Sequence, residues 1–166
     1  LSAHQGIILP LLVLSLPPFL SVLDLTLVNI TLPHIAGNYG ATPNEATLVV
    51  TFFAIAQAIS MPLSGALALR FGVMRMLMFS LAGFALASLL CGAAPSLNAL
   101  IASRVLQGLA AGPIIPLSQS MLQRTFPPRY VPMALTVFGV AMMTGPLVGP
   151  ALGGILADTV GWRWGF

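Results

Sequence analysis

The amino-acid sequence predicts an all-α bundle of helices that crosses a lipid bilayer. Of its 166 residues, 58% are hydrophobic and only 5% are charged, whereas soluble domains carry about 25% charged residues. A soluble fold of this size could not bury so much apolar surface, so the expected solvent is membrane hydrocarbon. Five apolar runs are long enough to cross a bilayer as helices. These runs are longer than the strands of a membrane β-barrel, and they lack the alternation of apolar and polar residues that such strands show.

The five predicted spans follow one another through short connections. The first lacks the basic start and cleavage site of a signal peptide, so we expect a permanent span, kinked at Pro17 and Pro18. The fourth follows the turn APSLN, where Ser96 or Asn98 can begin a helix. The closing segment DTVGWRWGF predicts the approach to a sixth span. The spans cover approximately residues 7–33, 47–69, 76–93, 99–122 and 133–157.

The distribution of arginines predicts the orientation of the bundle. Arg70 and Arg75 follow the second span, and Arg124 and Arg129 follow the fourth, whereas the opposite side carries only Arg163. Cytoplasmic loops are enriched in basic residues. We therefore expect the N-terminus and both arginine-bearing loops on the cytoplasmic side of the cell membrane (inner or plasma membrane).

Several classes of function find no support in the sequence. The arginines form no basic cluster for nucleic acid, and His4 and His34 lie far apart, near the expected span ends. The single Cys91 is expected to be a small buried hydrophobe. Without a metal set, a phosphate loop or a nucleophile–base pair, we expect neither an enzyme nor a cofactor. Trp162 and Trp164 are typical of the aromatic belt at the outer membrane surface.

Small residues at regular spacing predict close packing of the helices, because lipid does not drive apolar helices together. In the fifth span, Pro146, Pro150 and Gly154 form a second stripe beside the small one, which predicts a bent helix with a grooved face. The small stripes are Ala56, Ser60, Ser64 and Ala68 in the second span, Gly83, Ala87 and Cys91 in the third, and Ala141, Gly145, Gly149, Gly153 and Ala157 in the fifth.

Two charged residues lie inside predicted spans. Asp24 falls within the first span and Arg104 within the fourth, and a charge at the bilayer centre costs about 2.5–3.5 kcal/mol. Their depths differ by about 6 Å at a rise of 1.5 Å per residue, which an extended arginine can bridge if the helices are neighbours. Such residues usually carry function, and a structural ion pair is the alternative. An acid balanced between burial and a nearby arginine can exchange protons near physiological pH, which suits a proton-coupled device.

Four motifs containing these residues carry a family resemblance. Through them the chain resembles the major facilitator superfamily, specifically its fourteen-span multidrug:proton antiporter branch (EmrB/QacA type), over nearly its whole length. GWRWGF resembles the start of that branch's sixth span, and the first and last motifs together favour exporters. The motifs are LDLTLVNITLP with Asp24, Asn29 and Pro33; GALALRFGVMR with Gly65, Leu67, Arg70, Gly72 and Arg75; RVLQGLAAG with Arg104, Gln107, Gly108 and Gly112; and GPLVGPALGG with Gly145, Gly149, Pro150, Gly153 and Gly154.

The resemblance implies the N-terminal part of an antiporter that exports lipophilic or cationic small molecules while protons move inward. It assigns Asp24 as the proton or cation site, Arg104 as its tuning and relay partner, and Asn29 and Gln107 to the substrate cavity. The partners are then the lipid bilayer, the substrate, protons and the further C-terminal spans that transport requires. Two alternatives stay open: a proton-driven uptake symporter of the same fold, and a membrane fragment that transports nothing.

Three positions depart from the family pattern. Leu48 stands where the branch has a tryptophan, and Met74 where the loop motif has a basic residue. Leu69 replaces an acid that, in the family, pairs with arginines and a helix of the other half to keep the cytoplasmic side closed. We therefore expect a weaker inner gate in this protein.

Overall fold

The computed structural model describes residues 3–166, and these residues form helices and no strand. The all-α class is thereby confirmed. Five helical stretches are long and apolar enough to cross a membrane, and the fourth of them, Leu97–Thr125, consists of α4 and α5. The elements are α1 (Ala3–Tyr39), α2 (Pro43–Phe71), α3 (Val73–Gly92), α4 (Leu97–Ala111), α5 (Ile114–Thr125), α6 (Val131–Thr159) and the 3-10 helix η1 (Trp162–Gly165).

The helices begin and end at residues that favour helix termini. At the start of α2, the Thr42 hydroxyl accepts the Glu45 N–H, and the Glu45 carboxylate accepts the Thr42 N–H at 2.8 Å, which completes a capping box. Ser96 caps α4 by accepting the Ala99 N–H at 3.3 Å. Gly72 alone joins α2 to α3, with a φ of +89° that glycine adopts without steric cost. Since the helices continue beyond the apolar runs, the connections are shorter than the sequence suggests.

Proline affects two helices differently. The first helix remains helical through Pro17 and Pro18, whereas the fourth span is divided between α4 and α5 at Gly112 and Pro113. Pro113 has no N–H to continue the ladder. A side chain on Gly112 would lie 2.7 Å from the Gln57 carbonyl oxygen of α2. The break in the span therefore lies next to a close approach of the α2 and α4 backbones.

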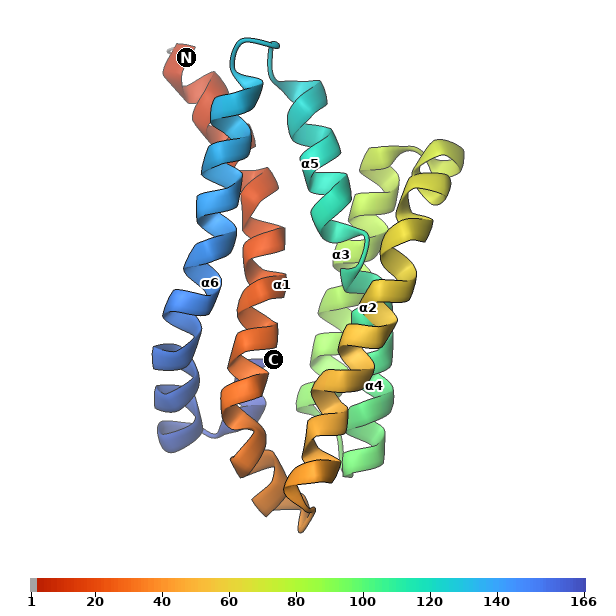
Figure 1. The fold of residues 1–166 in the computed structure, drawn as a ribbon, viewed down its shortest axis with the longest axis vertical. Helices are drawn as coiled ribbons and strands as arrows, with labels where there is room; N and C mark the ends of the chain where they lie inside the picture. Colours follow the sequence, from red (N-terminus) through yellow and green to blue (C-terminus); the bar gives the residue numbers. More distant parts are fainter. Residues whose placement is uncertain (1–2) are drawn as a thin grey trace.

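The helices form two groups that lie side by side (Figure 1). The first contains α1 packed along α6, and the second contains α2, α3 and α4, while α5 continues from α4 toward α1. Two apolar clusters fill the interior. One joins α1, α2, α3, α5 and α6 through residues such as Leu14, Leu117 and Phe138. The other joins α1, α2, α3, α4 and η1 through residues such as Val28 and Leu100. On α1, residue 24 falls between the two clusters.

The predicted stripes of small residues form helix contacts. All four members of the α2 stripe are buried, and Gly145, Gly149 and Gly153 of α6 are buried against α1. A Cβ on Gly149 would lie 2.8 Å from the Cβ of Thr26. The second stripe of α6 does not share this burial, because Pro146 is exposed. The small stripe is therefore a packing surface, as predicted.

Candidate functional site

The two intramembrane charges meet inside the bundle. Arg104 Nη1 of α4 donates to Asp24 Oδ2 of α1 over 2.7 Å. Arg104 has no exposed surface and Asp24 is 6% exposed. Because the α1 and α4 backbones make little direct contact, the long arginine side chain itself closes the distance. The helices that carry Asp24 and Arg104 are thus near enough for the two residues to form an ion pair.

Gln107 completes the arrangement around the carboxylate. Its Nε2 donates to Asp24 Oδ1 at 3.1 Å, while its Oε1 accepts Arg104 Nη1 at 2.6 Å. Both carboxylate oxygens therefore accept a hydrogen bond, as a buried carboxylate requires. Cys91 Sγ of α3 also donates to Gln107 Oε1, over 3.4 Å. Cys91 is buried as expected, but its contact with the polar cluster could not be anticipated from an isolated thiol in an apolar run.

The remaining surface of the arginine faces aromatic rings. Arg104 Cζ lies 4.1 Å from the ring centroid of Phe53 and 5.5 Å from that of Phe166. Arg104 Nε and Nη2 have no hydrogen-bond partner within the described part of the chain. Neither ring was predicted to belong to the site. The only available signal was the position of Phe53 on the same buried stripe as Ala56 and Ser60.

Asn29, the second predicted polar residue of the cavity, lies apart from this cluster. It is exposed on another face of α1, and its Nδ2 donates to the Leu25 carbonyl at 3.0 Å. There it lines a groove of about 320 Å³ between α1 and the start of α2, together with Pro33 and Thr47. The structure therefore brings Gln107 to Asp24 but leaves Asn29 in a separate groove.

A second groove, of about 410 Å³, reaches Asp24 from between α1 and α3. Its walls are mostly apolar, with Leu27 from α1 and Phe84 from α3, and it ends against Phe166. The Ser88 hydroxyl in its wall donates to the Phe166 carbonyl at 2.7 Å. Asp24 is thus buried yet adjacent to open space, a setting in which a carboxylate can meet a proton or a small ligand.

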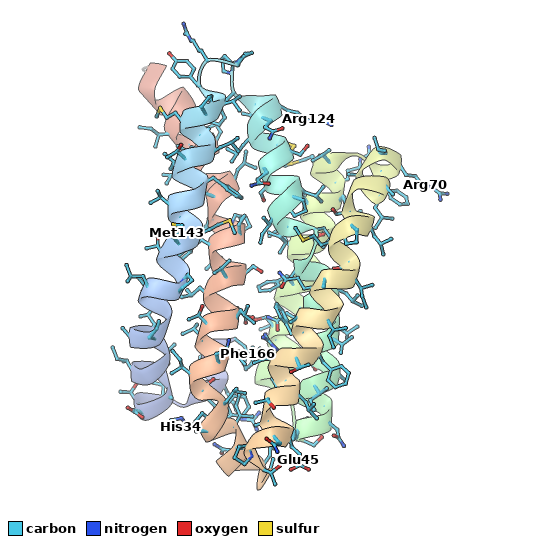
Figure 2. The ribbon with its side chains drawn as sticks, viewed as in Figure 1. His34, Glu45, Arg70, Arg124, Met143 and Phe166 are labelled. Carbon is cyan, nitrogen blue, oxygen red and sulfur yellow. The ribbon has the colours of Figure 1, made fainter. Side chains whose placement is uncertain are left out.

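The loop motif lies at the opposite end of the bundle from the acidic start of α2. Figure 2 shows Arg70 and Arg124 toward one end, and His34 and Glu45 at the other. Leu69 is 89% exposed and lines a groove of about 590 Å³ that also includes Arg124 of α5. The two arginine loops thus share one end of the molecule, which agrees with the arginine asymmetry in the sequence.

Arg163 ties the end of the chain to the bundle. Its Nη1 donates to the carbonyls of Gly92 and Ala94 at 3.0 and 2.8 Å, and its Nη2 donates to the Tyr39 hydroxyl at 3.2 Å. Trp162 packs edge-on against Tyr39 and is only 4% exposed. Its expected place in an interfacial belt is therefore wrong, because the ring is part of the core. Trp164, which is 76% exposed, keeps a position compatible with that belt.

His34 forms no part of the central cluster. His34 Nε2 lies 3.7 Å from Asp158 Oδ1 in an exposed contact between α1 and α6. The side chain of His4 lies outside the described residues. Among residues that are described, no group of three metal-ligating side chains occurs.

Sequence comparison defines the class of protein to which this fold and this ion pair belong. The family model described as Major Facilitator Superfamily matches residues 15–166. The chain therefore belongs to the major facilitator superfamily, a family of multi-pass membrane transporters, and the suspected membership is confirmed.

The more particular resemblance also holds. The chain is 47% identical to the multidrug export protein EmrB of Haemophilus influenzae over 161 residues, covering 97% of this chain and 32% of that protein. It is 46% identical to EmrB of Escherichia coli K12, covering 92% of this chain and 30% of that protein. It is 44% identical to the fatty acid resistance protein FarB of Neisseria gonorrhoeae, with the same coverage. The chain thus spans about a third of the length of these relatives and matches the EmrB type.

A solved structure confirms the fold. The crystal structure of a bacterial homologue of the human lysosomal transporter Spinster, inward-facing and unoccupied, superposes with a TM-score of 0.80 at 18% identity. The match covers 98% of this chain and 36% of that one. The helix bundle is therefore a major facilitator bundle.

Proposed function

We propose that this chain is the N-terminal part of a proton-coupled exporter of lipophilic or cationic small molecules. The observation that carries the proposal is the buried carboxylate of Asp24, held by Arg104 and Gln107 beside an apolar groove. The multidrug export relatives support the substrate class. The role is transport, and neither catalysis nor a cofactor is part of it.

The chemistry follows from the charge balance of the cluster. With Asp24 ionised, the pair with Arg104 is neutral overall, and both carboxylate oxygens accept hydrogen bonds. When Asp24 binds a proton, the cluster gains one positive charge in a region where uncompensated charge is costly. The protonated and ionised forms therefore favour different arrangements of α1 and α4, which is the requirement for coupling proton binding to a conformational change.

Competition for one carboxylate links the proton to the substrate. A cationic compound approaching Asp24 is favoured while the acid is ionised and disfavoured once the acid is protonated. A proton crossing the membrane potential releases about 2.3 kcal/mol per 100 mV, which can drive the opposite movement of substrate. Gln107 serves in this scheme as a ligand of Asp24, and the groove beside Asn29 is a separate candidate surface for the substrate cavity.

The proposed orientation places the N-terminus and the loops that follow α2 and α5 in the cytoplasm. It is supported by the basic residues that these two loops share at one end of the bundle. The membrane is then the cell membrane, and the partners are lipid, substrate, protons and the further spans that transport requires. The packing motif of α6, which includes Pro150 and Gly154, is proposed to take part in the change of access.

Asp24→Asn, introduced into the complete transporter gene, tests the proposal. The amide keeps the size of the side chain but cannot exchange a proton, so proton-driven export of a cationic dye from energised vesicles should be lost while the amount of protein is unchanged. Asp158→Asn is the matched control, because Asp158 is an exposed acid distant from the ion pair, and it should transport normally. Wild-type rates in Asp24→Asn would refute the coupling role. Dye uptake in place of export would favour the symporter.

A further inference from the structure

Arg104 is held by fewer polar contacts than a buried arginine normally has. Only Nη1 has hydrogen-bond partners, and it serves both Asp24 and Gln107, while Nε and Nη2 have none in the described structure. A guanidinium held at one corner can rotate about that corner. Hydrogen bonds within the described structure therefore do not fix its plane.

The ring of Phe53 occupies the face of this guanidinium. Its centroid lies 4.1 Å from Arg104 Cζ, and Phe53 has no exposed surface. At this distance a cation is attracted to the ring, most strongly where water is excluded. The ring is held close to the guanidinium because the backbones of α2 and α4 are in contact here. A Cβ on Gly108, one turn after Arg104, would collide with the Phe53 carbonyl oxygen.

We infer that Phe53 is a positioning residue whose ring holds the Arg104 guanidinium in place against Asp24. The inference rests on the proposed role of Asp24 as a proton site, and it assigns a function to a side chain that acts on the carboxylate through Arg104. When Asp24 binds a proton, its attraction for Arg104 falls. The ring then keeps the cation beside the acid, ready to pair again when the proton leaves.

The direction of the effect follows from the groups around Asp24. The charged side chain that faces it is Arg104 from α4, and the other titratable group of the cluster is the Cys91 thiol from α3, while Phe53 from α2 and Phe166 from η1 contribute rings. A nearby cation favours the ionised carboxylate. If the ring is removed, the guanidinium is free to move away, and the acid keeps its proton to higher pH.

The experiment measures proton binding directly on the complete transporter reconstituted in phosphatidylcholine vesicles. Infrared difference spectra recorded across a pH titration follow the carboxylic-acid carbonyl band, and Asp24→Asn identifies the part of that band due to Asp24. Phe53→Leu and Phe53→Met remove the ring while keeping an apolar side chain of similar size. The matched control is Phe52→Leu, the same change at the adjacent, exposed ring of α2. Circular dichroism confirms equal helix content in all variants.

Both ring-deleting variants should move the midpoint of the Asp24 band to higher pH, while Phe52→Leu leaves it unchanged. A midpoint in folded Phe53→Met or Phe53→Leu equal to that of the wild type overturns the positioning role and leaves the proposed proton site standing. A spectrum without any band that depends on Asp24 overturns the proton site, and the positioning role with it.

Discussion

Adding one methyl group to Gly108 should destabilise the bundle measurably. Gly108 lies on α4 where α2 is closest, and a Cβ there would lie 2.9 Å from the Ala56 Cβ and 3.2 Å from the Phe53 carbonyl carbon. Carbon atoms normally rest about 3.5–4.0 Å apart, so the two helices must separate by up to about 1 Å. Since the neighbouring atoms are backbone atoms of Phe53 and the Cβ of Ala56, no side-chain rotation can relieve the collision.

The net effect combines two opposing terms. Overpacking a tight contact costs typically about 1–3 kcal/mol, whereas replacing glycine by alanine within a helix gains about 0.5–1 kcal/mol. Gly108→Ala should therefore lower the free energy of unfolding by about 1 kcal/mol, within a range of about 0–2.5 kcal/mol. Separation of α2 from α4 also withdraws the Phe53 ring from Arg104, so the variant should share the altered Asp24 titration of the ring-deleting variants.

The assay is unfolding of the purified chain in mixed micelles by increasing sodium dodecyl sulfate, followed by circular dichroism. Gly139→Ala provides the matched control, because it makes the same change inside α6 where an added Cβ meets no described atom of another helix within 4 Å. That variant should be as stable as the wild type or more stable by up to about 1 kcal/mol. Equal stability of the two alanine variants would show that α2 and α4 do not pack at backbone distance, and the reasoning would fail.

Three further outcomes are expected. Arg163→Ala removes three hydrogen bonds that tie the chain end to the bundle and should cost about 1 kcal/mol in the same unfolding assay, whereas Arg129→Ala, an exposed loop change, should cost nothing measurable. A single cysteine at Arg70 should resist an impermeant maleimide added outside intact cells, and labelling there would reverse the proposed orientation. Leu69→Asp places an acid in the groove that contains Arg124 and, in the complete transporter, should reduce cysteine accessibility on the cytoplasmic side; unchanged accessibility would show that the gate does not depend on this position.

The sequence predicted the two charged residues of the site, Asp24 and Arg104, better than the residues that surround them. Asp24 and Arg104 stood out because charge is expensive in a bilayer, and their calculated depths were compatible with a bridge. What the spacing could not supply was the adjacency of their helices, which is a property of the whole bundle. The role of Phe53 could not be predicted for a related reason. One aromatic residue among many apolar ones cannot be assigned to a site until the structure shows a guanidinium on the face of its ring.

Errors at the ends of helices have a different origin. Trp162 was placed in the interfacial belt because hydropathy reports depth along the membrane normal and not distance from the bundle axis. The structure buries its ring against Tyr39, while Trp164, two residues later, is exposed.

The break between α4 and α5 was missed because the run remains apolar through Gly112 and Pro113, although a glycine followed by a proline marks a local weakness in a helix.

The motif RVLQGLAAG now has a physical explanation in which charge and packing depend on each other. Arg104 and Gln107 lie three residues apart and both reach Asp24, whereas Gly108 and Gly112 lie four apart and both face the backbone of α2. The glycines bring α2 close enough for the Phe53 ring to lie on Arg104, and the ring orients the cation toward the acid. A larger residue at Gly108 and a smaller one at Phe53 should therefore disturb the same proton equilibrium, one by moving a helix and the other by removing the ring.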